Sequence, residues 1–153
     1  MENKNIEYAQ ADAKTFFSSG FNCAESSLLS ICKALKINSD AVPNIATGFG
    51  AGVSRHGSIC GALSGAVMAM GLAEGRKDPK DNDTKIKLYE KAAAFLDKFK
   101  TEFGTVDCRE LTGCNLLSAE GREKFTNEKI HGEVCTKFVE FAVAEGIKAL
   151  KNK

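Results

Sequence analysis

Apolar residues recur at steps of three and four positions along almost the whole chain. This spacing is the period of an amphipathic α-helix, because it places the apolar side chains on one face. No run shows the convincing alternation of apolar and polar residues that indicates a half-buried strand. The pattern therefore predicts an all-α fold, a single-domain bundle of about five or six helices.

Glycine, proline and capping residues indicate where these helices begin and end. The expected long helices cover residues 5–17, 23–35, 58–74, 85–103 and 133–150, with short helical segments near 108–112 and 118–128. Residues 36–56 are expected to be largely irregular, since they contain Pro43 and the sequence GFGAG at 48–52. We find neither an internal repeat nor a domain boundary, so we predict one domain over residues 1–153.

Composition and charge exclude several classes of protein. The formal net charge is +1 and no basic tract is interleaved with aromatic residues, so we expect no nucleic-acid partner. The N-terminal sequence MENKNIEYAQADAK is polar and carries no apolar signal region. The longest apolar run, ICGALSGAVMAMGLA, is shorter than the roughly 20 residues of a membrane span, so we expect no membrane insertion. The expected location is cytoplasmic.

The chain holds six cysteines, a large number for a cytoplasmic protein of 153 residues. Thiols stay reduced in the cytosol, so a cysteine-rich protein there more often binds a metal or performs redox chemistry than forms structural disulfides. The sequence has no CxxC, which excludes the thioredoxin-like motif and the common zinc knuckle. It has no CxxCH either, which excludes a covalent haem site.

Four of the cysteines fall where helices are expected to begin. They are Cys23, Cys60, Cys108 and Cys135. Asn22 and Glu25 have the spacing of a capping box at the start of the second helix. Asp107 and Glu110 repeat that spacing, and Ser58 is the expected cap of the helix that contains CGALSG. Each of the four cysteines is therefore predicted to lie in the first turn of its helix.

A helix N-terminus is a favourable environment for a thiolate. Unpaired N–H groups and the positive end of the helix dipole attract negative charge there. A thiol in this position has a lowered pKa and serves as a nucleophile or a metal ligand. On this argument, Cys60 and Cys108 should react with alkylating reagents well below the ordinary thiol pKa of about 8.5. The alternative for all four cysteines is core packing, because free cysteine is among the most buried residue types.

The sequence CGALSG at 60–65 places two glycines directly after a cysteine in a predicted helix. Glycine in a helix interior costs about 1 kcal/mol relative to alanine, so its presence here needs a reason. Gly57, Gly61, Gly65 and Ala69 lie four residues apart and are therefore predicted to share one helix face. We predict that this face lets another helix or a cofactor approach the backbone closely.

Together these residues resemble a family of redox-active proteins named for a C…CGAxxG…C…C cysteine pattern. The similar segments are FNCAES at 21–26, GFGAG at 48–52, CGALSG at 60–65, CRELTG at 108–113 and HGEVC at 131–135. The resemblance implies that the four first-turn cysteines are the characteristic ones of the family. A similar domain occurs in split-Soret cytochromes, where an iron–sulfur centre accompanies the haems. This chain lacks the haem motif, so the cluster is the one part of that analogy that could apply to it.

The preferred interpretation is a small redox protein that binds an iron–sulfur cluster for electron transfer through Cys23, Cys60, Cys108 and Cys135. Cysteines that bind such clusters usually have closer local spacing, so two alternatives stay open. One is a metal-free thiol–disulfide protein or sensor that uses the same cysteines, and the other is a structural zinc domain. The sequence does not decide whether the protein is an enzyme, which redox protein is its partner, or whether it forms a homo-oligomer.

The remaining cysteines and the two histidines have weaker signals. Cys32 is expected to pack in the core on the apolar face of the second helix. Cys114 follows a glycine that ends a helix and is expected to be exposed, with a role as a resolving thiol as the alternative. His56 and His131 each precede a cysteine by four residues, a spacing that allows a shared site on one helix face. The alternative for each histidine is a solvated loop position.

Overall fold

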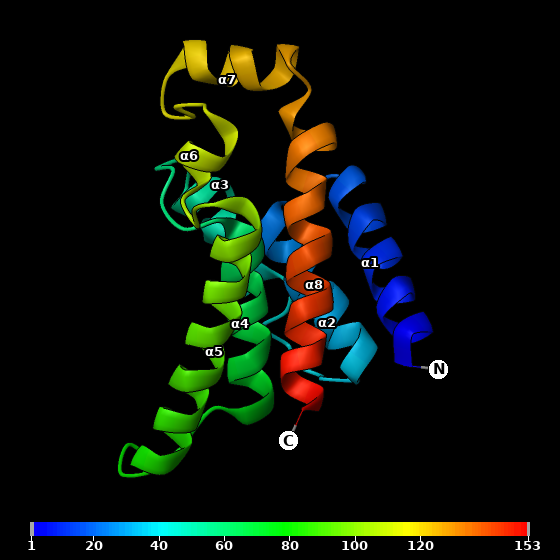
Figure 1. The fold of residues 1–153 in the computed structure, drawn as a ribbon, viewed down its shortest axis with the longest axis vertical. Coiled ribbons are helices and arrows are strands. Elements are labelled where there is room, and N and C mark those ends of the chain that lie inside the picture. The colour runs from blue at the N-terminus through cyan, green and yellow to red at the C-terminus, as the bar shows by residue number, and fades with distance from the viewer. Residues whose placement is uncertain (1, 153) are drawn as a thin grey trace.

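The computed structural model describes residues 2–152, and these residues form an all-α fold (Figure 1). The α-helices are α1 (Glu2–Ser18), α2 (Cys23–Leu35), α3 (Gly50–Val53), α4 (Gly61–Glu74), α5 (Asn82–Phe103), α6 (Cys108–Thr112), α7 (Ala119–Asn127) and α8 (Thr136–Lys151). A 3₁₀ segment, η1 (Asn44–Phe49), and a π-helical segment, η2 (His131–Cys135), complete the described chain. The all-α class is confirmed. The eight α-helices of residues 2–152 correct the predicted five or six, because very short helices are stabilised by packing more than by their own periodicity.

The local signals at several helix ends have their expected effects. At the start of α2, the Asn22 side chain accepts a hydrogen bond from the Glu25 N–H at 2.9 Å. The Glu25 carboxylate accepts one from the Asn22 N–H at 2.8 Å, which completes the predicted capping box. Gly104 ends α5 with a left-handed φ of 88°, a conformation that glycine adopts without steric cost.

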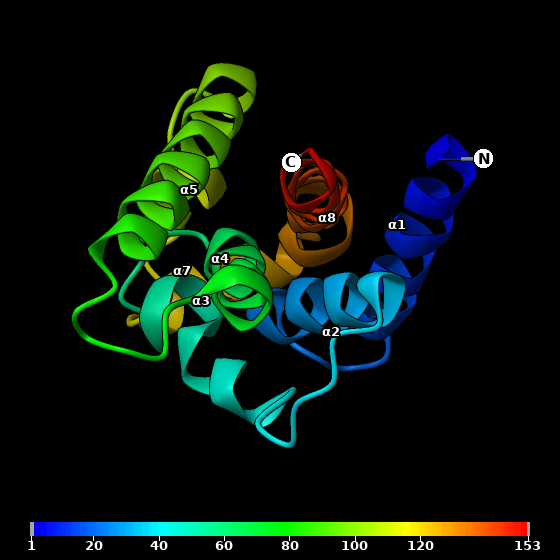
Figure 2. The ribbon, with the colours of Figure 1, turned by 90° about the horizontal axis from the view of Figure 1, so that it is seen from below.

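Three helices form the centre of the bundle. Helices α2, α4 and α8 pack against one another and contribute fully buried side chains such as Leu28, Leu63 and Val139. Helix α1 packs on α2 and α8, as the view along the bundle shows (Figure 2). Helix α7 lies across one end of the bundle, opposite the end where α1 begins and α8 finishes (Figure 1). The start of α2, α4 and α6 and the segment before α8 therefore lie towards the α7 end.

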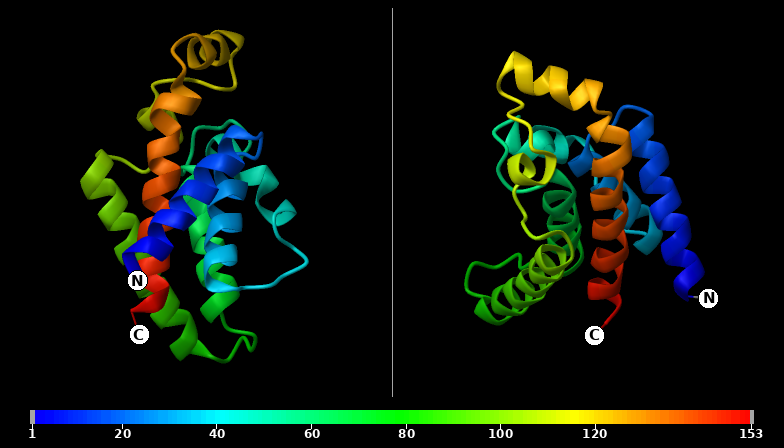
Figure 3. Two further views of the ribbon diagram at one scale, coloured as in Figure 1. Left: turned by 90° about the vertical axis from the view of Figure 1, so that its right-hand side faces the viewer. Right: turned by 45° about the horizontal axis from the view of Figure 1, so that its top comes forward.

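Helix α5 is the longest element and has few buried residues. Of its residues, only Phe95 and Phe99 are buried, where the helix packs against α4 and α8. Figure 3 shows it inclined to α8. Most of its residues are exposed to solvent. None of the helices within residues 2–152 is both long enough and apolar enough to cross a membrane.

The glycines of CGALSG lie at the contact between α4 and α2. A Cβ atom on Gly65 would collide with the Ala24 carbonyl oxygen and with the Ser27 hydroxyl, and one on Gly61 would collide with Cys23 Sγ. Across the same contact, the Ser27 hydroxyl donates to a backbone carbonyl of α4 at 2.9 Å. The prediction that these glycines permit a close approach is confirmed, and the approaching element is α2.

Candidate functional site

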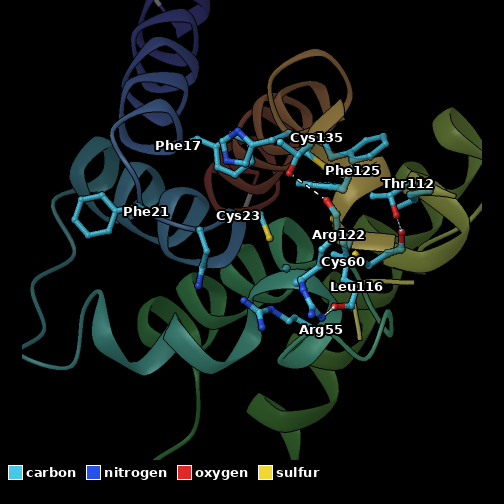
Figure 4. Close-up of a pocket in the computed structure, with 18 of the residues that line it drawn as sticks. Phe17, Phe21, Cys23, Arg55, Cys60, Thr112, Leu116, Arg122, Phe125 and Cys135 are labelled. Atoms are coloured by element: carbon cyan, nitrogen blue, oxygen red, sulfur yellow. Dashed lines mark hydrogen bonds between the residues drawn. The ribbon is translucent and has the colours of Figure 1, made fainter. Parts of the chain in front are cut away.

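The four cysteines predicted as ligands line one pocket of about 370 Å³ near the α7 end of the bundle (Figure 4). Cys23 and Cys108 are the first residues of α2 and α6, Cys60 immediately precedes α4, and Cys135 ends η2. The two cysteines outside the family pattern do not line this pocket. Tertiary packing thus brings together four thiols that are widely separated in the sequence. Their role as ligands stays a prediction.

A short backbone pairing places Cys60 and Cys108 near each other. An isolated antiparallel bridge pairs Ile59 with Asp107. The Cys60 N–H donates to the Val106 carbonyl at 2.8 Å, and the Cys108 N–H donates to the carbonyl of the residue before Ile59 at 2.7 Å. Residues on either side of such a bridge project to one face, so both cysteine side chains emerge on the same side of the paired segments.

Cys23 lies where the starts of two helices meet. It is the first residue of the capped helix α2, and its thiol is next to Gly61 at the start of α4. Burial raises the pKa of the Cys23 thiol. Hydrogen bonds from the backbone N–H groups of Ala51, Ala24 and Gly61 act in the opposite direction, because they stabilise the thiolate. This sulfur is therefore surrounded by donors suited to a negative charge.

A left-handed turn of the backbone forms another wall of the site. The φ angle is positive at five consecutive residues, 51–55, with values between 51° and 74°. Non-glycine residues lose about 1–2 kcal/mol each in this conformation, which persists only where the surrounding structure fixes it. Gly52 has no room for a side chain, since a Cβ atom would lie 2.7 Å from the Cβ of Cys108. The sequence GFGAG at 48–52, expected to be irregular, spans the end of η1 and the start of this turn.

The structure corrects two of the predicted helix starts, those near Cys60 and Cys135, and the predicted cap of the helix that begins at Cys108. Cys60 is the residue before α4 and not a residue of its first turn, and α4 is not capped by Ser58. The side chain of Asp107 accepts no hydrogen bond from α6, so the second capping box does not form. Cys135 is the last residue of a π-helical turn that continues directly into α8. The backbone is therefore already helical before Cys135, and this cysteine does not lie at a free helix N-terminus. Of the four, Cys23 alone has the capped N-terminus that its sequence predicted.

Burial determines the thiol pKa values in this pocket. Burial, with repulsion from the Cys23 thiolate and other sulfurs, raises the pKa of Cys108 to about 11 and that of Cys135 to about 12. The same two causes raise the pKa of Cys60 well above its ordinary value. The expectation that the thiols of Cys60 and Cys108 titrate below about 8.5 is therefore wrong for the metal-free protein. Desolvation raises their pKa by more than the nearby helix N-termini lower it.

We expect the stability of reduced, metal-free protein to fall as the pH rises above about 9. The folded-state pKa values of Cys108 and Cys135 are about 11 and about 12, both above the pKa of a solvated thiol in the unfolded chain. Between these values the folded protein binds more protons than the unfolded chain. The stabilisation is therefore complete below about pH 9 and is lost as the pH approaches the folded-state values. Urea unfolding at about pH 8 and about pH 10 measures this loss. The Cys108→Ala variant should show a smaller loss, and an equal loss in both proteins would contradict the assignment.

Cys114 is buried, which corrects its predicted exposure. Its exposed fraction is 1%, and it packs with Cys108 in a small apolar cluster. The reason is that α7 folds back over this segment, where the Lys124 ammonium donates to the carbonyl of Gly113 at 3.2 Å. A charge on Cys114 would raise the pKa of Cys108, so a fifth thiol lies beside the site. Cys32 is buried in the main core, as predicted.

The two histidines lie in different environments. His131 lines the pocket, and its ring stacks on Phe17 with 3.8 Å between the ring centroids and 16° between the planes. Burial lowers the pKa of His131, which favours the neutral imidazole. His56 is exposed and does not line the pocket. The solvated-loop interpretation fits His56, whereas His131 is part of the site.

Within residues 2–152, no group of three or more His, Cys, Asp or Glu side chains is close enough together to hold one metal ion. A single tetrahedral zinc ion with Zn–S bonds of about 2.3 Å needs sulfurs about 3.8 Å apart. A centre with several metal ions accepts ligands that are further apart, because different thiolates bind different ions. Four thiols around one pocket, one of them surrounded by N–H donors, fit such a centre.

Sequence reasoning missed much of the pocket wall. Phe17, Phe125 and Phe138 give it an apolar surface, and Arg122 reaches it from α7 (Figure 4). The Arg122 guanidinium is held in place by two hydrogen bonds, to the carbonyls of Leu116 and Leu117, each 3.0 Å long. No local pattern indicates these residues, because they come from three separate helices that meet only in the folded chain.

Comparison with known proteins gives a match over residues 21–147 to the family described as "Putative redox-active protein (C_GCAxxG_C_C)". The chain belongs to this family. The matched region contains all four pocket cysteines, and the resemblance found in the sequence is confirmed. The family label writes the glycine before the cysteine, whereas this chain has the order Cys60, Gly61, Ala62.

The chain is also similar to a protein from the archaeon Archaeoglobus fulgidus that is named only as an uncharacterized protein. It is 31% identical to this chain over 140 residues, which cover 86% of each chain. No solved structure matches this chain. Membership in the family therefore supports a redox role, while the cofactor has to be argued from the site.

Proposed function

We propose that this member of the redox-active family binds an iron–sulfur cluster through Cys23, Cys60, Cys108 and Cys135 and exchanges electrons with a partner protein. The observation that carries the proposal is that four thiols from four separate elements line one pocket of about 370 Å³. Cysteine thiolates are the usual ligands of such clusters, four to a cluster. When bound, the cluster would supply one-electron redox chemistry.

The charges around the pocket support a negatively charged centre. Four thiolates give a cluster net negative charge, which positive groups and N–H donors stabilise. Arg55 and Arg122 line the pocket, and three backbone N–H groups surround Cys23. Within residues 2–152, no Asp or Glu lines it. The surroundings therefore offset the charge that the ligands would bring.

The apolar wall supports a redox function in a second way. Phe17, Phe125 and Phe138 cover part of the pocket, and the thiols of Cys60 and Cys108 are less than one-tenth exposed. An apolar shell limits the access of water to a metal centre and so influences its reduction potential. These side chains would keep solvent away from the thiolates while the opening of the pocket faces a partner.

The second candidate function is a metal-free thiol–disulfide protein, which one observation favours. All six cysteines are free, and Cys114 is buried next to Cys108. A fifth thiol beside the pocket would provide a partner for one of the four others during oxidation. This function uses the same site but needs no metal.

The metal content of protein purified without oxygen tests the proposal. We expect brown protein that contains iron and acid-labile sulfide in similar amounts, with absorbance in the visible range. Colourless protein with one zinc ion per chain would contradict the cluster and support a zinc site. Metal-free protein whose thiols form and release a disulfide reversibly would support the second candidate.

A further inference from the structure

Two guanidinium groups line the cysteine pocket and form no ion pair with another residue of the described chain, 2–152. Arg55 and Arg122 both line the pocket and are both exposed to solvent. The ion pairs formed within residues 2–152 involve neither of them. Arginine presents a planar fork of donors that matches a carboxylate or a phosphate. Two such groups on one pocket are a common way to bind an anion.

The fold fixes the guanidinium group of Arg122 and the backbone of Arg55. Arg122 donates through Nη1 to the carbonyls of Leu116 and Leu117, which leaves its other N–H groups available. Arg55 is the last residue of the left-handed turn and has a φ of 74°. The turn is fixed by hydrogen bonds such as that from the Ser58 N–H to the Gly52 carbonyl at 2.9 Å. Neither side chain therefore needs a large rearrangement of the backbone to meet a ligand.

The rest of the pocket suits the apolar part of a small molecule. Phe17, Phe21 and Phe125 contribute aromatic surface to the pocket. Figure 4 shows Phe17 and Phe125 near Cys135, with Phe21 further away. His131 stacks on Phe17 and extends that surface. The volume of about 370 Å³ lies at the lower end of the range for small-molecule sites, about 300–1,000 Å³.

We propose that the pocket binds a small organic anion, with its carboxylate on Arg55 and Arg122 and its apolar body against the aromatic wall, next to the four cysteines. The ligand class follows from the side chains that line the pocket. Two guanidinium groups favour an anion, no lining residue of the described chain has a carboxylate that would repel it, and the aromatic rings favour an apolar body. A role for this anion as a redox substrate rests on the function proposed above. Its binding does not.

Calorimetric titration of the full chain tests this binding, with protein purified without oxygen and kept reduced. The probes are benzoate, phenylacetate and cinnamate, with benzamide as the neutral counterpart of benzoate. We expect at least one carboxylate to bind with a Kd below about 1 mM, and benzamide to bind at least about tenfold more weakly. Arg55→Gln and Arg122→Gln should each raise the Kd of that carboxylate by about tenfold or more, since each removes a charged hydrogen bond.

Arg76→Gln is the matched control. Arg76 lies in the loop between α4 and α5, where Nη1 donates to the Pro79 carbonyl, and it does not line the pocket. This variant loses the same charge from the protein and should leave the Kd unchanged. If Arg122→Gln unfolds because its loop loses two hydrogen bonds, Arg55→Gln, whose side chain has no such structural bonds, decides the question.

Three results would overturn the inference. They are the absence of carboxylate binding below about 1 mM, an equal effect of Arg76→Gln, and unchanged affinity in the two pocket variants. Loss of iron in the pocket variants with unchanged carboxylate affinity would assign the arginines to the cluster and not to a ligand. Iron analysis of the same samples separates the two proposals, because the anion can bind to protein without iron, and iron can be present without an anion site.

Discussion

The Gly65→Ala variant is expected to lose about 2 to 3 kcal/mol of stability, which corresponds to a fall in Tm of roughly 4 to 12 °C. The added Cβ atom would collide with the backbone carbonyl oxygen of Ala24 in α2. A backbone atom in a packed helix cannot rotate away as the end of a side chain can, so α2 and α4 have to separate. Thermal unfolding of the reduced, metal-free protein measures the loss.

Gly71→Ala is the matched control for this prediction. Gly71 lies in the same helix, but a Cβ atom there would meet nothing within 4 Å. Alanine is the better helix former, so this variant should gain up to about 1 kcal/mol. The two substitutions are chemically identical and should change stability in opposite directions. Equal effects, or an unchanged Tm in Gly65→Ala, would show that the glycine does not serve a close approach.

Serine in place of any one pocket cysteine is expected to remove the iron and sulfide from protein purified without oxygen. The variants are Cys23→Ser, Cys60→Ser, Cys108→Ser and Cys135→Ser. Each would replace one of the proposed thiolate ligands with a hydroxyl, which is a much poorer ligand for iron at neutral pH. Iron and sulfide analysis, with the visible spectrum, measures the loss. Circular dichroism shows whether each variant is still folded.

Cys32→Ser and Cys114→Ser are the controls for the ligand set. Cys32 is buried in the main core, and Cys114 lies beside the pocket without lining it. Both variants should retain the iron, even if their stability falls. Iron loss in Cys114→Ser comparable to that in Cys108→Ser would place a fifth thiol in the ligand set. Full retention of iron in a variant of the four pocket cysteines would exclude that residue as a ligand.

Local patterns were enough to predict the helical class and several boundaries. The capping box of Asn22 and Glu25 and the terminating Gly104 act through atoms a few residues apart, so the sequence displays them directly. The two glycines after Cys60 also indicated a close approach. The sequence did not indicate which element comes close to these glycines. That element is α2, and tertiary packing brings it into contact with α4.

Long-range packing decided the properties that matter for chemistry. The backbone bridge between Ile59 and Asp107 places Cys60 near Cys108. No sequence pattern predicts such an isolated bridge between two residues. Burial by neighbouring elements raises the pKa of Cys108 to about 11, although its position at a helix start suggested the opposite. The same burial overturned the expected exposure of Cys114.

By itself, the sequence determined that the chain is helical, that four cysteines stand at or near helix starts, and that it resembles the redox-active family. Only the tertiary structure decided that these cysteines line one pocket and that Arg122 reaches it from α7. The physical reason is the range of the forces. Helix periodicity and capping depend on neighbours within one or two turns, whereas burial, desolvation and the meeting of helix ends depend on residues that are distant along the chain.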